Sequence, residues 1–234
     1  MMNTNAPELP RWLTWGFPYG FALLTLVLVV FWPESIRHGF GGELGILENL
    51  EATVLAATLW IAILALRSGE IRQRRGLLLW VGLFSLGIIY ILGEEISWGQ
   101  HYFGWGTPEW YQAVNDQQET NLHNTSSWLD QKPRALIEFA VYFTMLIYPW
   151  LKRFWQPGLL TRLPAWMWPT GVCLPAALLM LIAQILDFSP LGKAGQSIGL
   201  RLSEMREFAL FFFFYCYIYS LYRRRASFAD QTQP

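Results

Sequence analysis

Six long apolar stretches constrain the fold more than any other feature of this 234-residue sequence. They lie at residues 15–32, 46–66, 77–98, 135–151, 169–187 and 205–222. The length of each is close to the roughly 17–25 residues that a helix needs to cross the hydrocarbon core of a bilayer. Open strands would leave backbone hydrogen-bonding groups unsatisfied in that environment. We therefore expect an all-α, polytopic membrane helix bundle of about six transmembrane helices, with residues 1–234 forming a single integral membrane domain.

Charged residues are scarce and balanced in sign. They make up 15% of the chain, against about 25% in an ordinary soluble domain, and 17 basic residues offset 17 acidic ones. No net positive field exists to attract nucleic acid, so we expect no nucleic-acid partner. The two cysteines, Cys173 and Cys216, lie far apart in apolar stretches and lack the spacing of a zinc site or a disulfide framework.

The basic residues predict how the helices are oriented. Cytoplasmic flanks of membrane helices are enriched in Lys and Arg, and an amino terminus in the cytoplasm places most of the basic residues on that side. Both termini are then cytoplasmic. The first stretch lacks a small-residue cleavage site, so we expect it to be retained. We expect the chain to lie in a bacterial inner membrane, with one face toward the periplasm or exterior.

In this topology, the acidic residues of five stretches all fall at the outer ends. Ionisable groups inside a membrane span are costly and usually mark a functional site. The helix macrodipole also favours acids in a first turn, but it opposes Glu94 and Glu95, which lie at a carboxyl end. That pair requires a cation, an arginine partner or protonation. The outer acids are Glu48, Glu51, Glu94, Glu95, Glu138, Asp187, Glu204 and Glu207.

The longest polar connection, residues 99–132, is predicted to be an aromatic connector on the outer face. Aromatic rings of this kind prefer the interface between membrane and water. A connector that rests in the headgroup layer and a lid over a site both fit this composition. The aromatic residues at its start are Trp98, Tyr102, Phe103, Trp105, Trp110 and Tyr111.

Histidines and carboxylates recur around this connector. If the helix continued past Glu94, Trp98 and His101 would share its face, and Glu119 and His123 are four residues apart, as on one helical turn. Carboxylate and imidazole groups are ligands of zinc, iron and manganese. We therefore expect a divalent metal ion held by Glu94, Glu119, His101 and His123. The expected substrate-binding residues are Trp98, Gln100, Asn121, Asn124 and Arg206.

Three runs in this region carry a resemblance: GEEISWGQHYFG at 93–104, TPE at 107–109 and ETNLHN at 119–124. They resemble an uncharacterised group of bacterial multi-pass inner-membrane proteins that share EEISWGQ, TP and LHN elements. The resemblance covers the middle third of the chain and implies no particular reaction. Glu94 and Glu95 also match the start of the EExxxR element of CAAX-type intramembrane endopeptidases, but no arginine follows. A three-histidine zinc site, as in alkaline ceramidase-like hydrolases, would require the distant His38.

These features favour a metal-assisted hydrolase or transferase that acts on a lipid or lipid-linked substrate in the membrane. Glu94 and Glu95 are the expected catalytic residues, with Glu95 as the general base. One alternative is a cation or small-solute transporter, because intramembrane carboxylates also serve ion pathways. Another is a non-catalytic assembly subunit, as a homo-oligomer or with a membrane partner. In that case the acids should pair with Arg134, Arg201 or Arg206.

Overall fold

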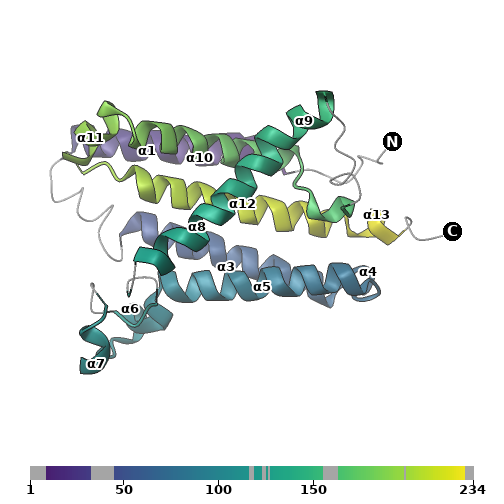
Figure 1. Ribbon diagram of the computed structural model, residues 1–234, viewed down its shortest axis with the longest axis horizontal. Coiled ribbons are helices and arrows are strands. Elements are labelled where there is room, and N and C mark those ends of the chain that lie inside the picture. The colour runs from purple at the N-terminus through teal and green to yellow at the C-terminus, as the bar shows by residue number, and fades with distance from the viewer. Residues whose placement is uncertain are drawn as a thin grey trace.

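The regular structure is helical throughout the part of the chain that the structure describes (Figure 1). This computed structural model describes residues 9–32, 45–115, 119–122, 125, 127–154, 163–197 and 199–229. The prediction of an all-α bundle is confirmed. The longer helices are α1 (Phe17–Phe31), α3 (Ile46–Arg67), α5 (Arg75–Glu95), α8 (Ser127–Tyr142), α10 (Leu174–Asp187) and α12 (Leu202–Arg223). The shorter α-helices are α4 (Gly69–Arg72), α6 (Gln100–Phe103), α7 (Glu109–Gln112), α9 (Tyr148–Phe154), α11 (Pro190–Ser197) and α13 (Arg225–Ala229).

Five helical segments are long and apolar enough to cross a membrane, judged by length and composition. They coincide with the first five predicted stretches, so the chain has the character of a multi-pass membrane protein. The sixth stretch lies within α12, whose many tyrosine and charged residues make it less apolar than the other five. The five segments are Trp12–Phe31, Ile46–Arg67, Arg75–Glu95, Lys132–Phe154 and Ala165–Asp187.

The fourth segment begins earlier than the sequence suggested. Helix α8 starts at Ser127 and continues through the π-helical turn η4 (Phe143–Ile147) into α9. The predicted connector at 99–132 therefore overlaps the first turns of α8, and it contains the short helices α6 and α7. The amphipathic start of α8 is too polar to stand out as part of an apolar stretch.

Helix ends carry residues that their position favours. Pro175 lies in the first turn of α10, where the missing amide hydrogen costs no helical hydrogen bond, whereas Pro18 of α1 follows the π-helical turn η1 (Trp12–Gly16) with which the first segment begins. Glu48 lies in the first turn of α3 and Arg67 in its last turn, and the helix macrodipole stabilises this placement of negative and positive charge. Local sequence thus sets where several of the membrane helices begin and end.

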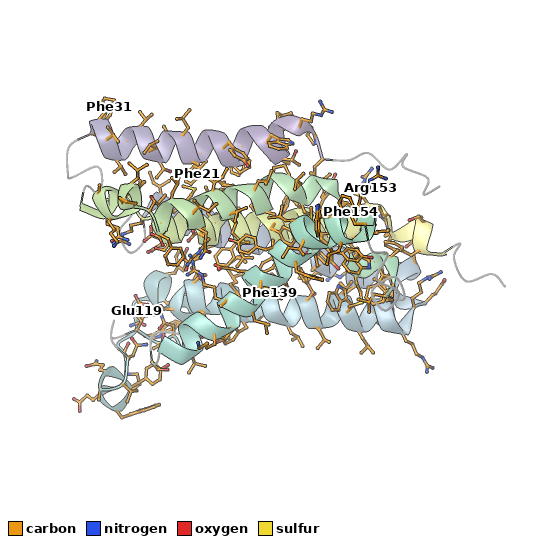
Figure 2. The ribbon with its side chains drawn as sticks, turned by 45° about the horizontal axis from the view of Figure 1, so that its top comes forward. Phe21, Phe31, Glu119, Phe139, Arg153 and Phe154 are labelled. Atoms are coloured by element: carbon orange, nitrogen blue, oxygen red, sulfur yellow. The ribbon has the colours of Figure 1, made fainter. Side chains whose placement is uncertain are left out.

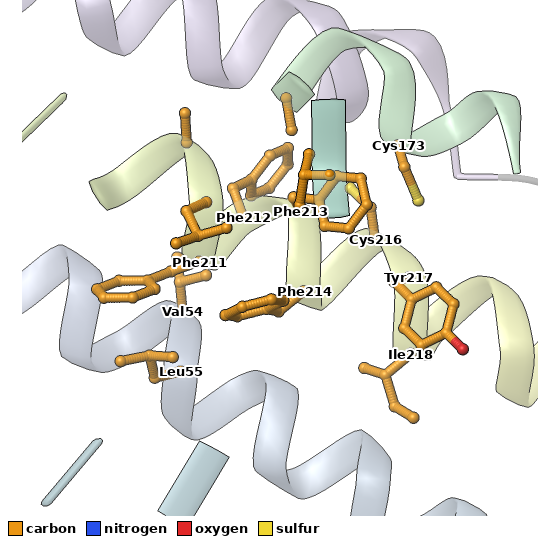
Figure 3. Packing of buried hydrophobic residues seen from close by; sticks show 14 of the residues in the cluster. Val54, Leu55, Cys173, Phe211, Phe212, Phe213, Phe214, Cys216, Tyr217 and Ile218 are labelled. Atoms are coloured by element: carbon orange, nitrogen blue, oxygen red, sulfur yellow. The ribbon is translucent and has the colours of Figure 1, made fainter. Parts of the chain in front are cut away.

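Helix α12 is the centre of the bundle. It packs against both α3 and α10, and α3 in turn packs against α5. Its buried face is unusually aromatic, as Figure 3 shows for the residues from Phe211 to Ile218. The ring centroid of Phe212 lies 5.6 Å from that of Phe17, and the centroid of Phe214 lies 5.9 Å from that of Phe84. These aromatic residues therefore form the packed core between helices.

The two ends of the bundle differ in charge. Helices α6, α7 and α11 lie at one end, which we call the cap end, and α4, α9 and α13 lie at the other, which we call the basic end (Figure 1). In Figure 2, Glu119 is labelled at the cap end and Arg153 at the basic end. The segregation of charge that the sequence suggested is therefore present in the folded chain.

Candidate functional site

Helix α5 ends at Glu95 in a turn with an unusual backbone. Ser97, Trp98 and Gly99 have φ angles of 45°, 54° and 101°, so three consecutive residues are left-handed. Glycine adopts this region readily, but for Ser97 and Trp98 it costs about 1–2 kcal/mol each. Such strain persists only where surrounding contacts hold it, and it often marks functional sites. The contacts that hold this turn come from residues 96–115 and 119–122, which we call the cap.

The turn folds the Trp98 ring back over the last turn of α5. A side chain at Gly93 would place its Cβ atom 2.9 Å from Cε3 and Cζ3 of that ring, so only glycine leaves room for it. The Trp98 indole then donates a hydrogen bond of 2.7 Å to Oε1 of Glu94. The sequence predicted that Glu94 and Trp98 would share a side of α5, and they do meet, but through this turn and not by continuation of the helix.

Glu94 is nearly buried, with 4% of its surface exposed. Its Oε2 atom accepts a hydrogen bond of 2.6 Å from the backbone amide of Leu122. Two donors from the cap therefore satisfy a carboxylate that the dipole of α5 opposes. An indole and a backbone amide thus occupy the roles that the sequence led us to assign to a cation or an arginine.

Glu119 belongs to the same network. Its Oε2 atom accepts hydrogen bonds of 2.6 Å from the Ser97 hydroxyl and 2.5 Å from the amide of Asn121. Asn115 in turn donates to Oδ1 of Asn121 and accepts the backbone amide of Glu119. Because Ser97 follows Glu94 closely and Asn121 precedes Leu122, the network brings the carboxylates of Glu94 and Glu119 into one buried cluster.

The side chain of Gln100 ties together two further parts of the cap. Its Nε2 atom donates to the Thr107 hydroxyl at 2.9 Å, and its Oε1 atom accepts the backbone amide of Thr120 at 2.8 Å. Gln100 thus connects α6 to the TP and ETN runs. The three runs that carry the resemblance are therefore neighbours in space, and their polar side chains hold one another in place.

Tyr111 closes the cap from α7. Its hydroxyl donates a hydrogen bond of 2.6 Å to the backbone carbonyl of Asn121. Desolvation, and after it the charge of Glu94, raises the pKa of Tyr111 above its usual value, while the hydrogen bond with Asn115 opposes this shift. The hydroxyl therefore remains a donor throughout the neutral range.

Several predicted site residues lie outside the described residues. These are His123 and Asn124, together with the side chain of His101, whose backbone belongs to α6. Residues 119–122 are not helical, and the predicted pairing of Glu119 with His123 stays a prediction because it extends beyond the described residues. Among the residues that are described, no group of three His, Cys, Asp or Glu side chains is arranged to hold a metal ion.

Arg206 belongs to a second charged cluster, between α8 and α12. Its Nε atom lies 3.0 Å from Oε1 of Glu138, and Arg134 lies 3.1 Å from the same oxygen. Arg134 also forms an ion pair with Glu207. Arg206 was expected to bind substrate. In the structure, it contributes to an ion-pair network that links two helices.

Sequence reasoning gave too little weight to Glu51. Only 1% of its surface is exposed, and its Oε1 atom has no hydrogen-bond partner among the described residues. The negative charges of Glu95, Glu204 and Glu48 act on it from α5, α12 and its own helix, and the positive charge of Arg134 on α8 opposes them. A useful signal was present, because a carboxylate in the second turn of an otherwise apolar helix faces the helices packed against it.

The cap end therefore combines two buried carboxylates that accept hydrogen bonds, Glu94 and Glu119, with a third, Glu51, whose Oε1 atom has no hydrogen-bond partner in the described part of the chain. Comparison with known proteins adds no assignment, since no family model, curated protein or solved structure matches the chain. Chemically, such an arrangement can bind a cation, exchange protons or accept hydrogen bonds from a polar headgroup.

Proposed function

We propose that this protein is a membrane-embedded enzyme, a metal-assisted hydrolase or transferase that acts on a lipid or lipid-linked substrate. The observation that carries the proposal is the network that joins Glu94 and Glu119, two carboxylates distant in sequence, beneath a strained left-handed turn. Strained turns and costly buried carboxylates are both concentrated at functional sites. The cap would place the reaction at the level of the lipid headgroups.

The donor set suits a divalent metal ion such as zinc, iron or manganese. Glu94 and Glu119 would supply carboxylate oxygens, and His101 and His123 would supply imidazole nitrogens. A divalent ion there would supply Lewis-acid activation of water. Glu95 would accept the proton from that water as the general base. The exposed indole of Trp98 and the amide of Asn124 would contact the substrate.

Metal content tests the proposal directly. Mass spectrometry on detergent-purified protein should find near-stoichiometric metal in the wild type and none in Glu94→Gln, Glu119→Gln and His123→Ala. Trp98→Phe removes the indole donor to Glu94 but keeps every proposed ligand, and Glu109→Gln removes an exposed acid from the same cap. Both controls should retain the metal ion.

Loss of metal from Trp98→Phe as well would show that any damage to the cap has the same effect. The absence of metal from the wild type would overturn the assignment of a metal-assisted reaction. Cation flux into liposomes that depended on Glu94 or Glu51 would instead identify a transporter.

We further propose that the chain lies in a bacterial inner membrane with the cap facing the periplasm and both termini in the cytoplasm. The excess of basic residues at the basic end supports this orientation. Single cysteines can test it, because Cys173 and Cys216 are both buried. A membrane-impermeant maleimide applied to intact spheroplasts should label Phe103→Cys and spare Lys152→Cys. The opposite pattern would reverse the orientation.

An assembly subunit is the second candidate, and the ion pairs between α8 and α12 favour it. Such a subunit should pair its carboxylates with arginines, as Glu138 and Glu207 do. The cap also exposes aromatic side chains, Phe103 and Trp110 among them, that could contact a second copy or a partner subunit. Native mass spectrometry distinguishes this reading. A defined oligomer or complex that is lost in Phe103→Ser with Trp110→Ser would support assembly.

A further inference from the structure

The basic end carries a concentrated positive charge. Among the residues described there, Glu70 is the one acid, and it lies 3.6 Å from Arg225. A surface of this kind attracts anionic groups, and the inner leaflet of a membrane supplies them in quantity. The basic residues described at this end are Arg11, Arg67, Arg72, Arg74, Arg75, Lys152, Arg153, Arg223, Arg224 and Arg225.

Arg224 and Arg225 each bury a guanidinium nitrogen that has no hydrogen-bond partner among the described residues, but the Nε atom of Arg225 lies 3.6 Å from the carboxylate of Glu70. Arg224 forms the C-cap of α12, and its Nε atom donates to the backbone carbonyl of Ser220 at 3.2 Å. Its Nη2 atom is inaccessible to solvent and has no hydrogen-bond partner among the described residues. Buried donors of this kind are rare, and an unmade bond to a charged group is costly. An acceptor from outside the chain would remove that cost.

The surroundings of Arg224 define the missing acceptor. The guanidinium lies 5.3 Å from the ring centroid of Phe228, and the hydroxyl of nearby Tyr217 already donates to the Trp166 carbonyl. Glu70, the acid at this end, is engaged by Arg225. Desolvation lowers the pKa of Arg224, with Tyr217 and Cys173 opposing the shift, so an anion would stabilise the charged form.

We propose that Arg224 binds the phosphate group of an anionic phospholipid at the basic end of the bundle. An arginine fork matches phosphate oxygens, and Arg224 lies just beyond the end of α12, at the depth where the headgroups of the adjacent leaflet would lie. The flanking Arg223 and Arg225 add positive charge. This site lies at the opposite end of the bundle from the cap and does not depend on the proposed enzymatic function.

Lipid binding can be measured on the full chain in nanodiscs. Native mass spectrometry should show phosphatidylglycerol retained by the wild type in preference to phosphatidylcholine. Arg224→Gln should weaken that retention about fivefold, as expected for one cation near an anionic surface. Arg67→Gln is the matched control, because it removes an exposed charge of the same end while keeping Arg224.

The thermal unfolding temperature gives a second readout. Phosphatidylglycerol should raise it in the wild type and in Arg67→Gln but not in Arg224→Gln, each compared with the same protein in phosphatidylcholine alone. If Arg224→Gln does not fold, Arg224→Lys can replace it, because lysine keeps the charge but lacks the guanidinium fork. Arg224→Lys should lose part of the stabilisation by phosphatidylglycerol. If Arg67→Gln and Arg224→Gln lost lipid retention and lipid stabilisation equally, the effect would come from general surface charge, and the proposal would be overturned. Stabilisation by inorganic phosphate without anionic lipid would overturn it in favour of a soluble anion.

Discussion

The close approach of Trp98 to Gly93 makes Gly93→Ala a sharp test of the cap. The new methyl group would lie 2.9 Å from two ring carbons of Trp98, closer than the atoms can remain. Helix α5 is held by its packing, whereas 46% of the Trp98 surface is exposed. The ring should therefore swing outward, and its 2.7 Å hydrogen bond to Glu94 should break.

The size of the effect follows from opposing contributions. A hydrogen bond to a charged group stabilises by about 1.5–3 kcal/mol, and the ring also loses its packing on α5. Replacement of glycine by alanine inside a helix raises the free energy of unfolding by up to about 1 kcal/mol, because alanine has the higher helix propensity. We expect a net loss of about 1–2 kcal/mol, which lowers the unfolding temperature by roughly 2–8 °C for a chain of this size.

Gly87→Ala is the matched control, because it lies in α5 as well and a Cβ atom there meets nothing within 4 Å. That variant should be neutral or slightly stabilised. Thermal unfolding in detergent measures both changes, and limited proteolysis of residues 96–122 reports whether the cap has loosened. If Gly93→Ala matches Gly87→Ala in both measurements, the proposed contact does not hold the cap.

Three further predictions concern the same end of the bundle. Ser97→Ala and Ser97→Gly both remove the hydroxyl that Glu119 accepts, but glycine relieves the left-handed backbone, so Ser97→Gly should be more stable by about 1 kcal/mol in thermal unfolding. Arg134→Ala should lower stability by about 1–3 kcal/mol because Arg134 binds two carboxylates, whereas Arg201→Ala, with its side chain 53% exposed, should change stability by at most about 0.5 kcal/mol in the same assay. Folding raises the pKa of Tyr111 above its usual value of 10.0. The neutral hydroxyl therefore contributes fully to the stability of the fold below pH 10.0, and this contribution is lost as the pH rises further. The unfolding temperature should therefore fall more steeply above pH 10.0 in the wild type than in Tyr111→Phe.

The membrane helices could be predicted because one physical requirement dominates them. A bilayer demands a certain length of apolar helix, and that length is visible in the sequence without knowledge of any contact. The prediction was less accurate where this requirement weakens. The polar first turns of α8 were assigned to the connector, and the central α12, whose tyrosines are satisfied by neighbours such as Trp80, is less apolar than the other helices.

The cap could not be derived in the same way. Glu94, Glu119 and Asn121 were identified as site residues, and the structure does bring them together. The turn that does so needs left-handed conformations at Ser97 and Trp98, for which these residue types give no local signal. Spacing rules assume a regular helix, and residues 119–122 are not helical, so the predicted pairing of Glu119 with His123 has no support from helical spacing in this part of the chain.

Glu51 shows where the chemistry at the cap end is best sought. Glu94 and Glu119 each have hydrogen-bond donors that stabilise their carboxylates beneath the cap. The buried Oε1 atom of Glu51 has no such donor among the described residues, and the negative charges of Glu95 and Glu204 are opposed there by Arg134. An apolar residue of similar volume would be neutral or stabilising at such a position. A chain that keeps a carboxylate there gives up stability, and proteins accept such local conflicts chiefly at functional sites. Under the proposed function, Glu51 would therefore lie close to the reacting group of the substrate.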